Sequence, residues 1–385
     1  MFNGFDFNQI EEYFIKNNIQ FSYGESIHSH TAKKIQLISS YIDNWLYVAS
    51  NSKVDDIYFI DLMSNAGLYE SGELSTYVEA LNSFVKHATK HEDKRFHLIC
   101  NDYDSLKFQT ISNVKKLYEE EFAKQGITNI IIETNNDDAL ILLNKLTSKF
   151  NKFSNRLVLL FVDPYCMINA DLAISILKFA KSVYSEIIIN YFYNDYIRNY
   201  KNENAKEKME SIHNFSLKVC NMNPLKSKPI DVRNKFIQLI LSTKMNYNYI
   251  FTMKNSCNGI LYYLLYFTPS LSGLRKIKNA TWKSFGCNNE FSPMNTERDY
   301  LNIFGETEEQ EKERYVLEDY KEHLKSLKGT VISYSSIEEY ILQNTPLSDG
   351  KILDIIIKPL IKDNLLLKQN VNGKNKYKDD DYLVI

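Results

Sequence analysis

The chain alternates between short apolar runs of strand length and longer stretches in which apolar residues recur with a helical period. Five apolar runs are predicted as buried strands, at 57–62, 96–100, 129–133, 157–162 and 186–191. Helices are predicted between them, near 74–91, 104–125, 137–150 and 170–182. Because each strand and its helix take about 30 residues, the size of a βαβ unit, the pattern predicts a parallel sheet with right-handed crossovers.

The fifth strand is followed by a polar region rich in Asn and Lys, 193–246, which is too long for an ordinary connection. We interpret it as a helical insertion in two pieces that lies over the ligand edge of the sheet as a lid or a substrate surface. Apolar runs at 249–253 and 260–268, joined by an Asn-Gly turn signal, predict an antiparallel hairpin. A helix over 30–50, with Thr31 as its N-cap, is predicted before the first strand.

The C-terminal part changes character. A heavily charged stretch at 306–328 is predicted to be a solvated helical connector. After it, amphipathic helices at 335–343 and 348–363 and a hairpin within 365–384 predict a small winged-helix domain, whose second helix commonly enters a DNA major groove. Asp379 to Asp381 place negative charge on the wing, which disfavours phosphate contact. Docking to a protein and binding to nucleic acid therefore both remain open.

These patterns predict an α/β fold with a doubly wound, mostly parallel seven-stranded sheet and a small C-terminal winged-helix domain. The expected parts are an N-terminal segment and helix that pack on the sheet domain, the sheet domain with its insertion, a charged connector, and the winged helix. Their expected ranges are 1–56, 57–290 with the insertion at 193–246, 291–329, and 330–385.

Polar residues stand where the first three strands end. Asp61 ends the first strand and leads into a turn-permissive loop at 64–67. Asp102 follows the second strand, and Asn136 and Asp137 follow the third. Open α/β sheets bind their ligands at this edge, so these residues are candidates for a binding site. Each could instead cap the helix that follows, where Asp and Asn are favoured.

Five parallel strands and an antiparallel pair, preceded by a helix, resemble the strand inventory of the class I S-adenosylmethionine-dependent methyltransferase fold. The resemblance implies S-adenosylmethionine as the cofactor. Asp61 would organise the loop that holds its methionine portion, Asp102 would accept hydrogen bonds from both ribose hydroxyls, and Asn136 and Asp137 would reach the adenine amine. The expected cofactor-binding residues are Asp61, Ser64, Asn65, Gly67, Asp102, Asn136 and Asp137.

Four stretches together resemble the three-Cys-motif partner proteins; they lie at 30–45, 60–67, 162–165 and 262–283. The resemblance implies a bacterial or phage-associated methyltransferase-like protein in a modification or defence system. It also implies a partner that carries a three-cysteine motif of the radical S-adenosylmethionine iron–sulfur type. The five Cys of this chain lie far apart, without a CxxC or Cys/His cluster, so we expect reduced thiols and no metal site here.

Two departures from the family pattern bear on catalysis. Asn65 replaces the first glycine of the loop; Asn adopts positive φ more readily than other side chains, but it narrows the approach to the cofactor. Asp163, Pro164 and Tyr165 resemble the Asp-Pro-Pro-Tyr motif of amino-methyltransferases with one proline missing. The resemblance implies that Asp163 holds the target amine, with a backbone carbonyl, while Tyr165 stacks on the base. The structural alternative is a strand end in which Asp163 is a cap and Pro164 opens a helix.

Composition limits the function classes. With 44% hydrophobic and 24% charged residues and a net charge of −2, the chain is an ordinary globular protein that does not coat nucleic acid by bulk charge. Its longest apolar run, 260–267, is far shorter than the ~20 residues that span a bilayer. The N-terminus lacks the pattern of a signal peptide, so we expect a cytoplasmic protein.

Two hypotheses of function follow. The first is an S-adenosylmethionine-dependent methyltransferase that acts on an exocyclic base amine of a nucleic acid. The second is a methyltransferase-shaped subunit that has lost catalysis and binds a partner protein or DNA.

Overall fold

The computed structural model describes residues 2–24, 26–151, 155–293, 305–369 and 380–385. The chain divides into two compact units: the first runs to Ser270, and the second begins at Leu271, apart from a short return to the first unit near Ser292. Among the described helices, none is long and apolar enough to cross a membrane. The described His, Cys, Asp and Glu side chains form no group that could hold a metal ion.

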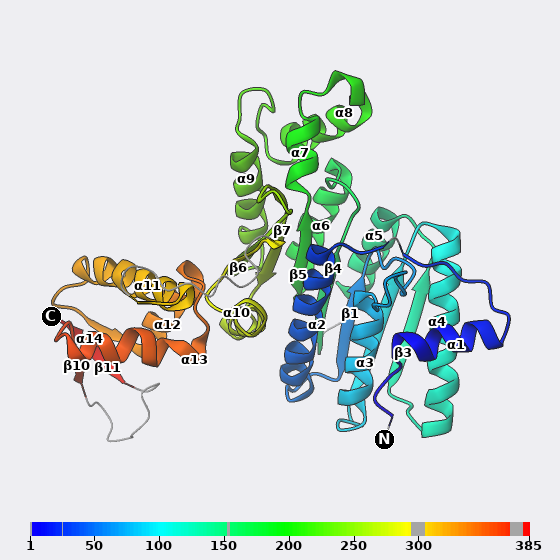
Figure 1. Ribbon diagram of the computed structural model, residues 1–385, viewed down its shortest axis with the longest axis horizontal. Coiled ribbons are helices and arrows are strands. Elements are labelled where there is room, and N and C mark those ends of the chain that lie inside the picture. The colour runs from blue at the N-terminus through cyan, green and yellow to red at the C-terminus, as the bar shows by residue number, and fades with distance from the viewer. Residues whose placement is uncertain (1, 25, 152–154, 294–304, 370–379) are drawn as a thin grey trace. The chain divides into compact units, whose positions relative to one another are not determined.

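Seven strands of the first unit pair in the order β3-β2-β1-β4-β5-β7-β6 (Figure 1). Strands β1 to β5 run parallel, and β7 runs antiparallel to its neighbours β5 and β6. The predicted mostly parallel sheet with a terminal hairpin is confirmed, and this strand order is that of the class I methyltransferase fold. The strands are β1 (Asp56–Asp61), β2 (Arg95–Asn101), β3 (Ile130–Asn135), β4 (Arg156–Val162), β5 (Glu186–Tyr191), β6 (Tyr247–Lys254) and β7 (Ile260–Thr268).

The strand order reverses at β1, which pairs with β2 on one side and β4 on the other. In parallel α/β sheets the carboxyl ends at such a switch point form the ligand crevice. Asp61 lies opposite Cys100 on β2 and Phe161 on β4, so the last residue of β1 reaches this point.

Helices connect the parallel strands as predicted, and α2 packs against α3 while α5 packs against α6. The predicted stop at Gly126 is confirmed by its left-handed φ of 69°. The predicted N-cap at Thr31 is wrong: α2 begins at Ser29, because the N–H of Thr31 already donates to the carbonyl of His28. The helices are α1 (Phe7–Lys16), α2 (Ser29–Ser50), α3 (Thr76–Ala88), α4 (Ser105–Gln125), α5 (Ala139–Phe150) and α6 (Ala170–Ser182).

The insertion packs mainly on α6, through η2 (Phe215–Val219), α8 (Lys206–Asn214) and α9 (Pro229–Leu241). Phe215 and Phe236 join the apolar core of the sheet domain. The short helix α7 (Tyr193–Asn199) follows β5 directly and contacts β7. Only this first part of the insertion is therefore close to the carboxyl edge of the sheet.

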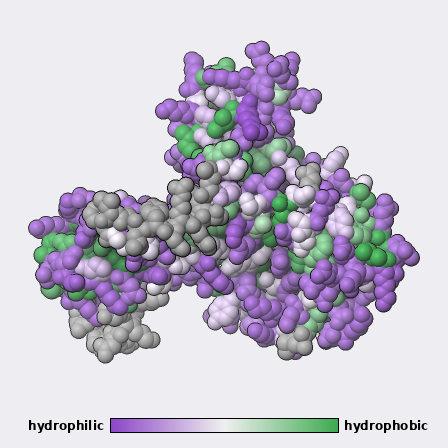
Figure 2. Space-filling model, viewed as in Figure 1, coloured by the Kyte–Doolittle hydropathy of each residue, from purple (hydrophilic) through white to green (hydrophobic). Residues whose placement is uncertain are grey.

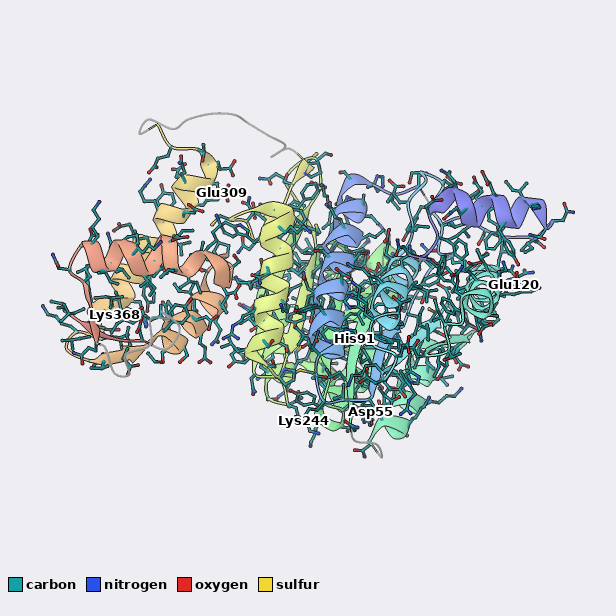
Figure 3. All side chains as sticks on the ribbon, turned by 90° about the horizontal axis from the view of Figure 1, so that it is seen from below. Asp55, His91, Glu120, Lys244, Glu309 and Lys368 are labelled. Atoms are coloured by element: carbon teal, nitrogen blue, oxygen red, sulfur yellow. The ribbon has the colours of Figure 1, made fainter. Side chains whose placement is uncertain are left out.

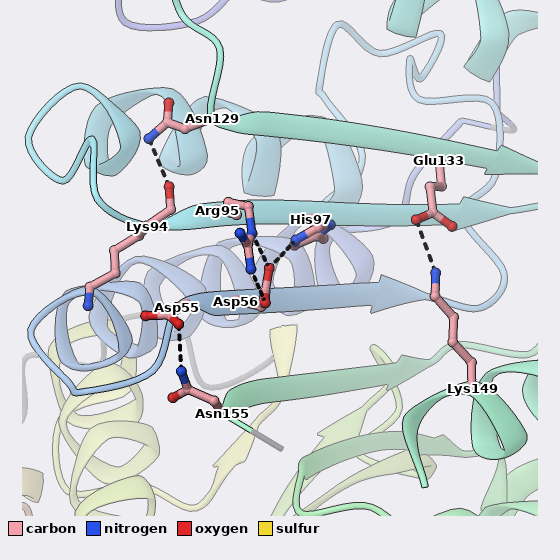
Figure 4. A network of polar contacts seen from close by, with 9 residues as sticks. All are labelled: Asp55, Asp56, Lys94, Arg95, His97, Asn129, Glu133, Lys149 and Asn155. Atoms are coloured by element: carbon pink, nitrogen blue, oxygen red, sulfur yellow. Dashed lines mark hydrogen bonds and ion pairs between the residues drawn. The ribbon is translucent and has the colours of Figure 1, made fainter. Parts of the chain in front are cut away.

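Polar and charged side chains contact one another at the amino ends of β1 and β2, the end of the sheet opposite the carboxyl ends of the strands (Figure 4). Arg95 donates two hydrogen bonds to Asp56, at 2.7 and 2.6 Å, and His97 Nε2 lies 2.8 Å from the same carboxylate. Asn155 Nδ2 donates to Asp55 at 2.6 Å. These contacts reinforce the pairing register far from the carboxyl ends. Glu120 on α4 is an example of a charged side chain that is exposed (Figure 3).

The second unit contains a three-stranded antiparallel sheet in the order β10-β11-β9. The sequence predicted two of these strands and missed β9, a three-residue strand before α12. Its elements are α10 (Leu271–Phe285), β8 (Glu290–Phe291), α11 (Glu308–Lys325), β9 (Val331–Ser333), α12 (Tyr334–Asn344), α13 (Asp349–Ile352), η4 (Leu353–Ile357), α14 (Lys358–Lys362), β10 (Leu366–Gln369) and β11 (Asp381–Val384). The winged-helix assignment stays a prediction.

The second unit begins earlier than the sequence suggested, since α10 was expected to belong to the sheet domain. Arg275 on α10 donates two hydrogen bonds to the buried Glu338 on α12, at 2.7 and 2.6 Å. Lys278 on α10 donates to the carbonyl of Thr345. The charged helix α11 is not wholly solvated either, because Tyr320 is only 1% exposed.

The predicted acidic wing lies partly outside the described residues, which include neither Asp379 nor the predicted turn at 372–373. Asp380 is buried and pairs with Lys368 Nζ at 2.8 Å. The charge of Asp380 is therefore balanced within the unit.

Candidate functional site

A cavity of about 430 Å³ lies at the carboxyl ends of β1, β4 and β5. Its wall also includes the start of α2, the loop after β1, the first turn of α4, and α7. Of the sequence-predicted residues, six line it: Asp61, Ser64, Asn65, Asp163, Pro164 and Tyr165. Four do not: Gly67, Asp102, Asn136 and Asp137.

Asp61 is the most deeply buried acid of the cavity wall, at 1% exposure. Its Oδ1 has no hydrogen-bond partner within the described part of the chain. Burial, and next the neighbouring Asp163 carboxylate, raise the pKa of Asp61 to about 8. An unpartnered buried carboxylate oxygen is costly, so this atom is suited to a donor that enters the cavity.

The loop after β1 has, at Asn65, the left-handed backbone conformation that glycine adopts most readily. Asn65 has a φ of 59°, as the sequence analysis expected of an Asn at this position. Its side chain turns back on the loop: Oδ1 accepts from the N–H of Ala66 at 2.8 Å, and the side chain also hydrogen-bonds with Tyr69. Gly24 makes room for it, because a Cβ there would lie 2.8 Å from Asn65 Nδ2. Asn65 therefore forms part of the wall and leaves the cavity open.

Gly67 has a different role from the one predicted for it. Its φ is 98°, and a Cβ at this position would lie 2.2 Å from the hydroxyl of Tyr77. The glycine is required for the close packing of the loop on α3. It does not line the cavity.

The residues after β2 and β3 hold the loops together. Asp102 accepts hydrogen bonds from the N–H groups of Asn65 and Asp104, at 3.0 and 2.9 Å. Asn136 donates to the carbonyl of Asp102 at 2.7 Å, and Asp137 pairs with Lys145 at 2.8 Å. None of the three is a helix cap, since Asp104 caps α4 and Asp138 caps α5.

Asp163 is held by two side chains from other elements. Lys34 Nζ on α2 lies 2.5 Å from Asp163 Oδ2, and Asn190 Nδ2 on β5 donates to Oδ1 at 2.6 Å. Asn190 Oδ1 is buried and has no partner within the described part of the chain. The sequence analysis included Lys34 in the stretch at 30–45 that carries the family resemblance but gave it no role in the site, and it did not single out Asn190. Lys34 could have been found, because it falls on the apolar face of its helix, one turn before Ile38.

Pro164 and Tyr165 follow Asp163 at the mouth of the cavity. The structural alternative in which Pro164 opens a helix is wrong, because α6 begins at Ala170 and is capped by Asn169. Tyr165 is 61% exposed, and its hydroxyl accepts a hydrogen bond from Lys107 Nζ at 2.7 Å. Lys107 Nζ also lies 4.5 Å from the centre of the Tyr165 ring, as in a cation–π contact.

Aromatic residues close the cavity on the side of α2 and β7. Tyr262 is buried, and its hydroxyl donates to the carbonyl of His30 at 3.3 Å. Burial, and then the charges of His28 and Lys34, lower the pKa of His30 to about 4. The His30 ring is therefore neutral at physiological pH and adds no charge to the wall.

No protein-family model matches the chain, and no curated protein matches it either. Among solved structures, a protein of Legionella pneumophila assigned to the family DUF519 is similar, with 12% identity and a TM-score of 0.39 over 67% of this chain and 94% of that one. A putative class I S-adenosylmethionine-dependent methyltransferase of Listeria monocytogenes has 8% identity and a TM-score of 0.32, over 69% and 70% of the two chains. The plantazolicin methyltransferase BpumL in complex with SAH has 10% identity and a TM-score of 0.27, over 68% and 90%. These values are low, so the fold assignment rests on the strand order and the antiparallel β7.

Proposed function

We propose that this chain binds S-adenosylmethionine in the cavity and methylates an exocyclic amine of a nucleic-acid base. The observation that carries the proposal is the meeting of Asp61, with its unpartnered oxygen, and Asp163 in one cavity at the switch point of the sheet. Fold alone would not support an activity, because the same fold hosts many functions.

The cavity fits the methionine end of the cofactor. Asp61 Oδ1 suits its ammonium group. Ser75 and Thr76, at the N-terminus of α3, line the same cavity and suit its carboxylate. The Ser75 hydroxyl is buried and has no partner within the described part of the chain, and it makes no cap hydrogen bond to α3. At the ribose end, Asp102 would have to share a carboxylate that already accepts two backbone hydrogen bonds.

The other end of the cavity offers groups for an amine and a ring. Asp163 and Asn190 Oδ1 present acceptors for the two hydrogens of a primary amine, and Tyr165 can stack on an extruded base. Bound S-adenosylmethionine would supply a methyl group on a sulfonium. The methyl group would pass to the amine nitrogen, and the electron pair of the broken carbon–sulfur bond would stay on sulfur. Asp163 would hold the amine by a hydrogen bond, and Asp163 or solvent would take the N–H proton that the amine loses. The protein contributes orientation and charge stabilisation.

Local charge supports a nucleic-acid substrate. Residues 193–246 carry ten Lys and Arg side chains and five Asp and Glu side chains, a net charge of +5 in a protein whose total is −2. Arg198 on α7 and Lys107 on α4 line the cavity itself. The face in view over α7 to α9 is mainly hydrophilic (Figure 2). A region with excess positive charge attracts a phosphate backbone. Only its first helix, α7, reaches the cavity, where Asp195 offsets Arg198, so the excess charge lies farther along the insertion.

The second unit and the partner belong to this proposal as well. Its helices and three-stranded sheet suit a winged helix that supplies recognition of DNA or of a protein. The partner would be a protein with a three-cysteine motif of the radical S-adenosylmethionine type, in a bacterial or phage modification or defence system. The association is tested by purifying a tagged copy of this chain from a strain that expresses it and asking whether that partner protein co-purifies.

One set of observations favours the alternative, a methyltransferase-shaped binding subunit. Both oxygens of Asp163 already have partners, and so do both oxygens of Asp102. Calorimetry with S-adenosylmethionine and S-adenosylhomocysteine, followed by transfer of a labelled methyl group to DNA and RNA with and without the partner, separates the two functions. Cofactor binding without transfer in any condition supports the subunit, and absence of cofactor binding refutes the proposed methyltransferase.

A further inference from the structure

Lys34 carries a buried ammonium group that has more N–H donors than the pairing with Asp163 uses. Its residue exposure is 7%, and within the described residues its side chain donates one hydrogen bond, to Asp163 Oδ2 at 2.5 Å. The Tyr262 ring lies 5.7 Å from Nζ, so it offers at most a weak cation–π contact. An ammonium group has three N–H donors, which leaves two without a partner within the described part of the chain. Lys34 lines the cavity, so a ligand can reach these donors.

The ion pair with Asp163 uses only part of the hydrogen-bonding capacity of Lys34. Asn190 already donates to Asp163 Oδ1, so that carboxylate has one neutral partner without Lys34. Buried charged donors without acceptors are costly, so such groups are usually hydrogen-bonded or paired. Because Lys34 lines the cavity, a bound ligand can supply the acceptors. The wall therefore presents a donor, Lys34 Nζ, beside acceptors, Asp163 and Asn190 Oδ1.

The bases differ in what stands next to their amine. In adenine and cytosine, the exocyclic amine donates, and the adjacent ring nitrogen of the Watson–Crick edge accepts. In guanine, the exocyclic amine stands next to a ring N–H on the Watson–Crick edge, so this edge presents two neighbouring donors; the ring acceptor N3 lies on the other side of the amine, away from that edge. A flipped base is read on this edge by hydrogen bonds. Lys34, a donor, and Asp163, an acceptor, complement the acceptor and donor of adenine and cytosine. Against the two donors of guanine, Lys34 would face another donor.

We infer that Lys34 donates to the ring nitrogen beside the target amine while Asp163 accepts from the amine, which makes adenine or cytosine the substrate base and excludes guanine. This rests on the proposed function, in which a base enters the cavity. It goes further by assigning a specificity role to Lys34 and a class of base to the site. Tyr165, which can stack on any base, adds affinity without this selectivity.

The test measures binding to short single-stranded DNA of thymine that contains one adenine, one 1-deazaadenine, one cytosine or one guanine. Thymine has no exocyclic amine, and 1-deazaadenine keeps the amine but lacks the ring acceptor. Wild-type protein with S-adenosylhomocysteine should bind the adenine or cytosine strand more tightly than the guanine strand. Replacing adenine by 1-deazaadenine should weaken that binding roughly ten- to hundred-fold, the range for a hydrogen bond to a charged group. Transfer of labelled methyl groups should follow the same order.

Lys34→Met removes the donor and should abolish the discrimination between adenine and 1-deazaadenine. Lys33→Met is the matched control, because Lys33 is adjacent on α2 but bonds to the exposed Gln36; it should discriminate as the wild type does. Equal binding of adenine and 1-deazaadenine by wild-type protein overturns the inference, whatever the folding of the Lys34 variant. Preference for guanine also overturns it. If S-adenosylmethionine binds but no strand binds better than thymine alone, the inference fails while the cofactor site stands.

Discussion

Lys34 Nζ on α2 lies 2.5 Å from Asp163 Oδ2 at the end of β4, and the two side chains are 9% and 19% exposed. This ion pair joins a helix that precedes the sheet to the residue with the clearest catalytic resemblance. Removing one partner of a buried pair leaves the other charge uncompensated. Substitutions at Asp163 therefore affect stability as well as chemistry.

Asp163→Ala should lower the free energy of unfolding by about 3–5 kcal/mol, because the Lys34 ammonium stays buried without its carboxylate. The double variant Lys34→Met with Asp163→Leu should recover most of that loss, since no charge remains buried. Urea denaturation of the three proteins measures the difference. A small loss in Asp163→Ala would mean that the pair is as weak as an exposed one.

Asp163→Asn should separate chemistry from stability. The amide keeps an acceptor oxygen but cannot hold negative charge beside the amine. We expect methyl transfer to fall on the order of a hundredfold or more, with the affinity for S-adenosylmethionine unchanged. Single-turnover transfer and calorimetry measure the two quantities. A parallel loss of cofactor affinity would place Asp163 in the cofactor site instead.

Asp61 should make stability depend on pH. The folded protein holds its proton up to about pH 8, whereas the unfolded chain releases it near the ordinary value of 3.8. In between, the unfolded state binds fewer protons, so the free energy of unfolding contributed by Asp61 falls as pH rises through this window. Asp61→Asn should lack this component. Denaturation midpoints of both proteins across pH 4 to 8 test it, and parallel profiles would contradict the raised pKa.

The same group should couple cofactor binding to proton release. A ligand ammonium at Asp61 favours the ionised carboxylate, so binding near neutral pH should release up to about one proton. Calorimetry in buffers of different ionisation enthalpy counts it. Asp61→Asn is the control, since it has no proton to lose.

Asp102 tests the ribose end of the proposed site. Asp102→Ala leaves the N–H groups of Asn65 and Asp104 without their acceptor, so stability should fall by about 1–3 kcal/mol. If Asp102 also binds the ribose, affinity for S-adenosylmethionine should fall by about 1.5–3 kcal/mol. Asp102→Asn keeps an acceptor and should lose less of each. Lower stability with unchanged affinity would restrict Asp102 to holding the loops.

A chain that ends at Ser270 should bind S-adenosylmethionine as tightly as the full chain, because every residue that lines the cavity lies in the first unit. A chain that ends at 329 is the informative comparison. It keeps α10 and α11 but lacks α12, the partner of Arg275, and η4, against which α11 packs. We expect it to be less soluble than the shorter chain. Loss of cofactor affinity in the chain ending at Ser270 would mean that the second unit contributes to the site.

The sequence by itself determined that the chain forms a sheet domain and where most of its strands and helices lie along the chain. Apolar runs that end in Asp61 or lead into Asp163 predict strands because parallel strands are buried on both faces. The positive φ of Asn65 and the helix stop at Gly126 follow from local backbone preferences, which need no tertiary contact. These features could be read from short stretches.

Only the tertiary structure decided which polar residues share the cavity. The strand order brings Asp61 and Asp163 together in the cavity. Asp102 instead accepts a hydrogen bond from the N–H of Asn65, and Asp137 pairs with Lys145. The spacing of these residues in the sequence does not reveal such contacts. Lys34 is 129 positions from Asp163 along the chain, so no local pattern could pair them. The end of a strand fixes the position of a residue's backbone. The residue that its side chain contacts depends on elements that are far away in the sequence.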